Sequence, residues 1–119
     1  MPAVSPEIRY RVRVVRGDDI AIGPGKVDLL EAIDAAGSIT AAAKQLGMSY
    51  RRAWLLVDTM NRCFAEPVVA TEAGGAHGGG TRLTASGAEV VRCYRNAESR
   101  AAKASAADLA ALAALLRRA

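Results

Sequence analysis

Residues 37–54 read GSITAAAKQLGMSYRRAW, an alanine-rich stretch that is broken in its middle by Gly47. A glycine inside a helix costs roughly 1 kcal/mol relative to alanine, so the break needs a geometric reason. Ser38 is a good N-cap for a first short helix. The inward residues of that helix are predicted to be Ile39, Ala42, Ala43 and Leu46.

Gly47 permits the left-handed backbone that ends this helix, and Ser49 can cap a second helix that begins at Tyr50. Apolar residues then recur at spacings of three and four, which predicts a buried stripe of Ala53, Leu56, Val57 and Met60. The small Ala43 allows the two helices to pack closely at a steep angle. This pattern predicts a helix-turn-helix.

The second helix of such a pair offers its N-terminal residues to the major groove of DNA. Tyr50, Arg51 and Arg52 occupy that turn, opposite the predicted buried stripe. A helix optimised only for stability would favour acidic residues there, because its N-terminal end is positive, so the arginines favour DNA binding. A structural αα-hairpin with exposed arginines stays open as an alternative. Trp54 is predicted to be a core or interdomain residue rather than one that stacks on bases.

The net charge of +4 is distributed unevenly along the chain. Residues 1–37 contain five Lys/Arg and six Asp/Glu, residues 38–84 contain five and three, and residues 85–119 contain six and three. An excess of cations after residue 37 suits a polyanionic partner. Solvated helix faces would produce the same excess, and that interpretation stays open.

Residues 8–14, IRYRVRV, alternate strictly between apolar and basic side chains, which predicts a strand with one buried face. Residues 20–23 can return as a second strand of an N-terminal hairpin. The exposed arginine row would either contact phosphates or protect an edge strand from aggregation. The GPGK at 23–26 lacks the spacing of a Walker loop. Instead, Pro24 opens a helix that ends at Gly37 and buries Val27, Leu30, Ile33 and Ala36.

Two short β-prone segments follow Pro67, at 68–71 and 81–84, with EAGGAHGGG between them. The glycines predict an exposed hairpin tip whose backbone can approach another surface closely. Two strands after a helix-turn-helix describe a wing, with His77 and Arg82 as its candidate DNA contacts. A lone histidine in such a loop is otherwise simply exposed. It is also the only histidine of the chain, and the cysteines lack ligand spacing, so no zinc site is expected.

The last segment is predicted to be helical from Ala85, capped by Thr84. It forms either one long helix or two stacked helices that break near Ser105, where a new cap is available. Its apolar stripe is too long for one small domain to cover, so pairing with a second copy is expected. The stripe comprises Val90, Val91, Tyr94, Ala97, Leu109, Leu112, Leu115 and Leu116.

Cys63 and Cys93 are far apart and lie in apolar-periodic segments, which indicates buried free thiols in a reducing compartment. The sequence shows neither a membrane span nor a leader peptide, so a cytoplasmic location is expected. It offers no catalytic constellation, so neither enzymatic activity nor a cofactor is expected.

The stretch GPGKVDLLEAIDAAGSITAAAKQLGMSYRRAWLLVDTMN (23–61) and the later GGAHGGGTRLTASG (74–87) closely resemble the N-terminal DNA-binding domain of the molybdate-responsive regulator ModE. Stand-alone relatives of that domain are often labelled LysR-type. The resemblance covers residues 8–100, approximately. It implies a winged helix-turn-helix that dimerises through its terminal helices and regulates genes, often those for molybdenum uptake or enzymes.

Two departures from the family pattern limit what the resemblance implies. The chain ends at Ala119, without room for molybdate-binding domains, so no molybdate site is expected within it. Family wings commonly carry a lysine where Ala76 stands, with a glycine in place of His77, so the cationic contact of this wing is expected to be weaker or pH-sensitive.

The sequence thus predicts a mainly α protein with a small β component: a winged helix-turn-helix with an N-terminal hairpin (1–84) and a long C-terminal dimerisation helix (85–119). The predicted function is a homodimeric regulator of transcription that binds double-stranded DNA. A winged-helix module that binds an acidic protein is the alternative. Lys44, Arg51 and Arg82 are predicted to contact phosphates, and Tyr50 and Arg52 to reach base edges. The predicted DNA-binding residues are Ser38, Thr40, Lys44, Ser49, Tyr50, Arg51, Arg52, Gly75, His77, Gly78, Gly79 and Arg82.

Overall fold

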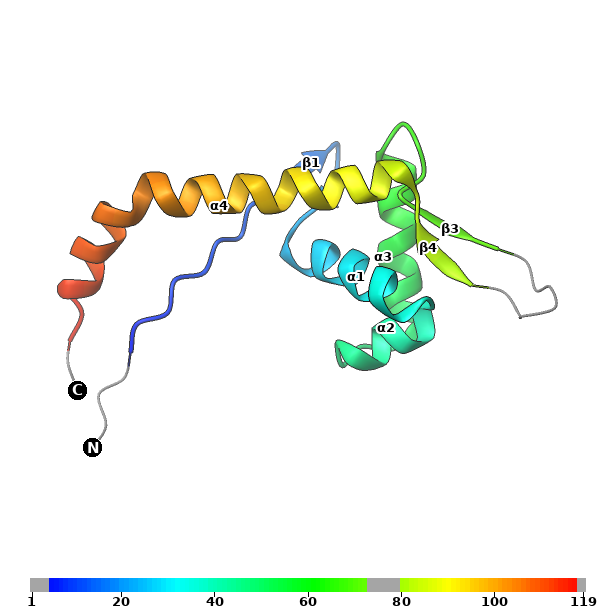
Figure 1. Cartoon of the computed structure of the whole chain (residues 1–119), viewed down its shortest axis with the longest axis horizontal. Coiled ribbons are helices and arrows are strands. Elements are labelled where there is room, and N and C mark those ends of the chain that lie inside the picture. The colour runs from blue at the N-terminus through cyan, green and yellow to red at the C-terminus, as the bar shows by residue number, and fades with distance from the viewer. Residues whose placement is uncertain (1–4, 73–79, 118–119) are drawn as a thin grey trace.

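The computed structural model describes residues 5–72 and 80–117, in which helices predominate and two small hairpins accompany them (Figure 1). Along the chain the elements are β1 (Val14–Arg16), β2 (Asp19–Ile22), α1 (Pro24–Ala36), α2 (Ile39–Gln45), α3 (Tyr50–Cys63), β3 (Val69–Thr71), β4 (Thr81–Leu83) and α4 (Ala85–Ala114). This order confirms the predicted architecture of a winged helix-turn-helix with a long last helix.

Caps and glycines set the helix boundaries where the sequence predicts them. Ser38 and Ser49 each accept a hydrogen bond from the amide three residues on, at 3.0 and 3.1 Å. Gly37 and Gly47 have φ values of 75° and 68°, a region that favours glycine. The turn between α2 and α3 therefore depends on Gly47, as expected.

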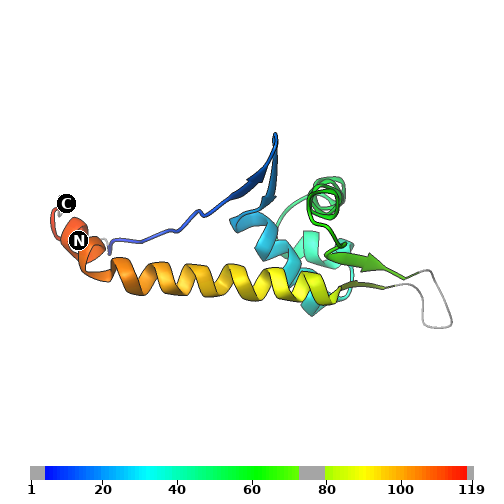
Figure 2. The same cartoon turned by 90° about the horizontal axis from the view of Figure 1, so that it is seen from above.

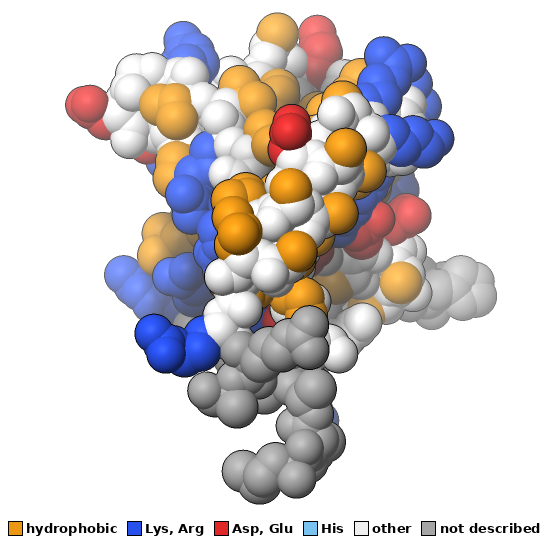
Figure 3. Space-filling view, turned by 90° about the vertical axis from the view of Figure 1, so that its left-hand side faces the viewer, with side chains coloured by type: hydrophobic (Ala, Val, Ile, Leu, Met, Phe, Trp, Pro, Cys, Tyr) orange, Lys and Arg blue, Asp and Glu red, His pale blue; other side chains and the backbone are white. Residues whose placement is uncertain are grey.

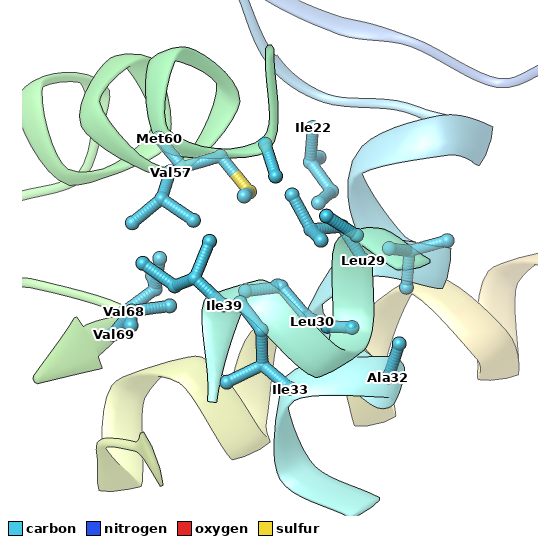
Figure 4. Packing of buried hydrophobic residues seen from close by; sticks show 14 of the residues in the cluster. Ile22, Leu29, Leu30, Ala32, Ile33, Ile39, Val57, Met60, Val68 and Val69 are labelled. Carbon is cyan, nitrogen blue, oxygen red and sulfur yellow. The ribbon is translucent and has the colours of Figure 1, made fainter. Parts of the chain in front are cut away.

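The core lies where α1, α2 and α3 meet, with β2 and β3 at its edges (Figure 4). Figure 4 shows Leu30 and Ile33 of α1 near Ile39 of α2, with Val57 and Met60 of α3 on the opposite side of the core. The buried face of α1 is broader than the predicted stripe, since it includes Leu29 and Ala32, whereas Ala36 is exposed. Leu56 of α3 is only half-buried. The fully buried large side chains are Val27, Leu29, Leu30, Ile33, Met60 and Val68.

The wing is fixed to the helices at its base. Strands β3 and β4 are antiparallel, with Val69 opposite Leu83. The side chain of Asn61 in α3 accepts hydrogen bonds from the amides of Val68 and Val69, at 2.8 and 3.2 Å, and donates one to the Val69 carbonyl oxygen at 3.2 Å. On the other strand, the amide of Thr81 donates to the Gly37 carbonyl oxygen at 2.9 Å. The wing therefore keeps a defined position relative to α3.

Helix α4 is a single element of 30 residues, which decides between the two predicted alternatives. Ser105 does not cap a new helix, because its hydroxyl donates to the Ala101 carbonyl oxygen one turn earlier. Such bonds bend helices, and Figure 1 shows the axis of α4 curving in its last third. Its first half packs on the core through Tyr94. Arg95 forms ion pairs with acidic residues of α1 and α4, namely Asp28, Glu31 and Glu98.

The predicted strand over residues 8–14 is wrong in its extent, because β1 begins only at Val14. Residues 5–13 form an extended segment, here called the N-terminal arm, that runs toward the far end of α4 (Figures 1 and 2). Two hydrogen bonds hold it to α4. Tyr94 donates to the Val12 carbonyl oxygen at 2.8 Å, and the Tyr10 and Ser105 hydroxyls lie 3.0 Å apart. Ile8 and Val12 remain exposed, at 52% and 39%.

The cysteines are less buried than expected. Cys63 is half-buried and Cys93 is exposed on α4. Periodicity placed Cys93 on an apolar face correctly, and that face borders an open groove that Val12, Val90 and Tyr94 also line. None of the described helices is long and apolar enough to cross a lipid bilayer.

Candidate nucleic-acid interface

The first turn of α3 carries the predicted contact residues on the surface. Tyr50, Arg51 and Arg52 are all exposed, and this turn contains no acidic side chain. Ser49 is also exposed, and its hydroxyl satisfies the amide of Arg52. The tip of α3 thus combines the positive end of a helix dipole with two guanidinium groups, which favours an anionic partner.

Arg51 and Arg52 occupy different flanks of α3. Arg51 lines a shallow pocket of about 300 Å³ with Tyr50 and Trp54. Arg52 lines a separate cleft of about 280 Å³, together with Leu56 and residues of the N-terminal arm and α1. The two arginines are adjacent in the sequence, but consecutive side chains of a helix point in directions about 100° apart.

Trp54 corrects one prediction. It does not belong to the core, because 46% of the residue is exposed. The buried stripe of α3 follows Ala53, Val57 and Met60, and Trp54 lies beside it on the flank of Tyr50. Tyr50 and Trp54 are four residues apart, so a helix places them on one face. Together with Arg51 they offer aromatic surface and a cation to one partner.

The predicted contacts of α2 lie beside the tip of α3. Lys44, in the last turn of α2, and Thr40 are exposed. Ser38 is half-buried, and its hydroxyl caps α2 by accepting from the Ala41 amide. Lys44 is therefore the cationic side chain of α2 that is exposed to a partner.

The described part of the wing contributes Arg82, which is exposed on β4. Its guanidinium lies 2.9 Å from the Glu72 carboxylate, in an ion pair with both side chains more than half exposed. Such a pair is worth little in water, so a phosphate can compete for the arginine. The predicted contacts Gly75, His77, Gly78 and Gly79 lie outside the described residues.

Across residues 5–72 and 80–117, no group of three or more His, Cys, Asp or Glu side chains is placed to hold a metal ion.

Comparison with known proteins finds several relatives that are similar in sequence to this chain. The chain is 44% identical over 92 residues to the molybdenum transport protein ModE of Azotobacter vinelandii, which covers 76% of this chain and 34% of that protein. It is 44% identical over 82 residues to the molybdenum-pterin-binding protein MopB of Rhodobacter capsulatus, covering 69% of this chain and 30% of that protein.

A third relative is the DNA-binding transcriptional dual regulator ModE of Escherichia coli K12, at 37% identity over 71 residues, or 60% of this chain and 27% of that protein. The chain spans about a third of the length of the curated relatives it matches. No family model matches it. By name, these relatives are a molybdenum transport protein, a molybdenum-pterin-binding protein and a DNA-binding transcriptional regulator.

Proposed function

We propose that this chain, a homologue of the N-terminal region of the ModE regulators, binds double-stranded DNA as a homodimer and regulates transcription. The observation that carries the proposal is the exposed tip of α3, where a glycine turn and a serine cap present Tyr50 and Arg51 beside Trp54. An N-terminal turn of this kind is the part of a helix-turn-helix that enters the major groove.

The geometry suggests exchanging the roles predicted for the two arginines. Arg51 lies at the middle of the exposed face of α3, with Leu55 and Asp58 along the same face, so we propose that it reaches base edges. Arg52 lies on the flank toward α1 and is better placed for a backbone phosphate. Lys44 and Arg82 keep their proposed phosphate contacts, and Tyr50 and Trp54 are proposed to pack against the duplex.

DNA binding of this kind has an expected salt dependence. If two or three cations per subunit contact phosphates, the logarithm of the affinity should fall with the logarithm of salt concentration with a slope of roughly −4 to −6 for the dimer, at about −0.9 per contact. Fluorescence polarisation with a labelled duplex from the promoter region of the chain's own operon measures this slope. An affinity that does not change with salt would contradict phosphate binding.

The same measurement separates the proposal from a winged-helix module that binds an acidic protein. A sequence-specific regulator should bind the promoter duplex more tightly than a random duplex of equal length and composition, typically by about 10³-fold or more. Equal and weak binding to both duplexes would favour the protein-binding module.

Because two relatives carry molybdenum transport or molybdenum-pterin binding in their names, we propose genes of molybdenum metabolism as targets. Selection of bound genomic fragments tests this.

The exposed apolar surface of α4 supports the proposed homodimer. The helix is about 45 Å long at 1.5 Å per residue, and Tyr94 is its last buried residue. Leu112, Leu115 and Leu116 are exposed near its C-terminal end, Leu115 to 82%. Figure 3 shows hydrophobic side chains gathered on this end of the molecule. A second apolar surface, a cavity of about 350 Å³ between the arm and α4, is lined by Val12, Val14, Phe64, Val90 and Tyr94 among others.

Replacing Leu112, Leu115 and Leu116 together by serine is expected to convert the dimer into a monomer. The three side chains are between 59% and 82% exposed, so the fold should persist while the apolar area that drives pairing is lost. Sedimentation equilibrium measures the change in mass. Serine at Ala107, Ala110 and Ala114, which are exposed on the same helix, is the matched control and should leave the dimer intact. If the variant with serine at all three leucine positions remains dimeric, this end of α4 is not part of the interface.

A further inference from the structure

A cleft lies where the N-terminal arm crosses the beginning of α1. It has a volume of about 280 Å³ and is lined by four cationic side chains from three separate parts of the sequence: Arg11 and Arg13 of the arm, Lys26 of α1 and Arg52 of α3. Arg52 is one of the residues predicted to bind DNA, and Arg11 and Arg13 belong to the arginine row for which phosphate contact was an open alternative.

Salt bridges do not neutralise this cleft within the described part of the chain. None of its four cationic groups forms an ion pair with a carboxylate there, whereas the described arginines of several other surfaces do. Burial lowers the pKa of Lys26, and the charges of Arg52 and Arg13 lower it further, against the opposing effects of Cys63 and Asp19. Like charges held this close repel one another, and a bound anion would remove that repulsion.

The backbone beside these cations is also suited to an anion. Gly23 precedes α1 and offers no side-chain cap, Pro24 opens the helix, and the first turn contains no acidic residue. The amides of Gly25 and Lys26 therefore have no partner within the helix. A Cβ at Gly23 would lie 3.3 Å from the Cγ of Arg13, so glycine allows the arm to pass closely over this helix end.

We propose that this cleft binds a phosphate-type oxyanion. Its volume is small for an organic ligand but ample for a tetrahedral anion with some of its water. Two sources share this chemistry: a backbone phosphate of the duplex gripped by α3, or a free anion in solution. Only the first source depends on the proposed DNA binding.

The test uses two double variants. The cleft variant combines Arg13→Gln and Lys26→Gln. The control variant removes one arginine and one lysine charge elsewhere, by Arg100→Gln and Lys103→Gln. The control residues are exposed on α4 and do not line the cleft. In the first experiment, inorganic phosphate is compared with chloride at equal ionic strength without DNA. A free anion should raise the Tm of the wild type and the control but not of the cleft variant, and should shift the wild-type amide resonances of Gly25 and Lys26.

In the second experiment, the salt dependence of DNA affinity is measured for all three proteins. If the cleft takes a DNA phosphate, the slope for the cleft variant should be less steep by about 1 to 2 per subunit than that of the control. A positive result in the first experiment assigns a free anion, and one in the second alone assigns the DNA backbone. If the cleft variant and the control behave alike in both, and the wild-type amides do not shift with phosphate, the proposal is overturned. Failure of the proposed function would appear differently, as a wild type that binds no duplex at low salt.

Discussion

Replacing Gly87 by alanine is expected to destabilise the protein by about 3 kcal/mol, the largest effect on stability of any single methyl group considered. Gly87 is buried in the first turn of α4, where a Cβ would overlap the carbonyl oxygen of Val68 and lie 3.0 Å from its carbonyl carbon. These are backbone atoms of the segment leading into β3, and the same oxygen accepts a hydrogen bond from the Thr84 amide at 3.0 Å. Relief of the overlap would have to separate α4 from the wing.

Thermal unfolding followed by circular dichroism measures this effect, and the Tm should fall by about 10 °C. Gly25→Ala is the matched control, because Gly25 also lies in the first turn of a helix but a Cβ there meets no atom within 4 Å. That substitution is expected to stabilise the chain by about 0.4 to 1 kcal/mol through the unfolded state. If both variants unfolded at the wild-type temperature, the close packing of α4 on Val68 would be wrong.

Arg51→Ala is expected to produce the largest loss of DNA affinity among single substitutions. A guanidinium that forms two hydrogen bonds with a guanine edge is worth about 1 to 3 kcal/mol, and a dimer loses it twice. The affinity for the promoter duplex should therefore fall at least about thirtyfold, while binding to random DNA changes much less. Competition binding with both duplexes measures the two losses together.

Arg62→Ala is the control for this prediction. Arg62 lies in the last turn of the same helix, and its guanidinium is already paired with Asp58 at 3.1 Å and Asp19 at 3.8 Å. It should change DNA affinity little. Arg52→Ala is expected to weaken binding to both duplexes about equally, as loss of a phosphate contact would. A loss of discrimination with Arg52→Ala and not with Arg51→Ala would restore the roles predicted from the sequence.

Local chemistry explains why much of the fold could be predicted from the sequence. Gly37 and Gly47 end helices, Ser38, Ser49 and Thr84 begin them, and each of these signals acts within four residues of its own position. The three-residue strands of the wing were also predictable, because glycines separate two β-prone segments.

The predictions that were wrong concern features that depend on contacts between residues far apart in the sequence. The alternation of residues 8–14 is real, but a strand needs a partner, and the chain supplies one only from Val14 onward. The large apolar body of Trp54 favours a core or interdomain position, yet Ala53 and Val57 fill the buried side of α3 and leave Trp54 outside the core. Phosphate contact by the arginine row was one of two open alternatives, but its grouping with Lys26 and Arg52 in one cleft depends on the path of the arm and was not predictable.

The central claim, that the tip of α3 grips duplex DNA, is tested most directly by following backbone amide resonances while the promoter duplex is added at low ionic strength. The largest shifts are expected at residues 49–55, with smaller ones at Lys44 and at residues 81–83. Shifts confined to α4, or no shifts with any duplex, would contradict it.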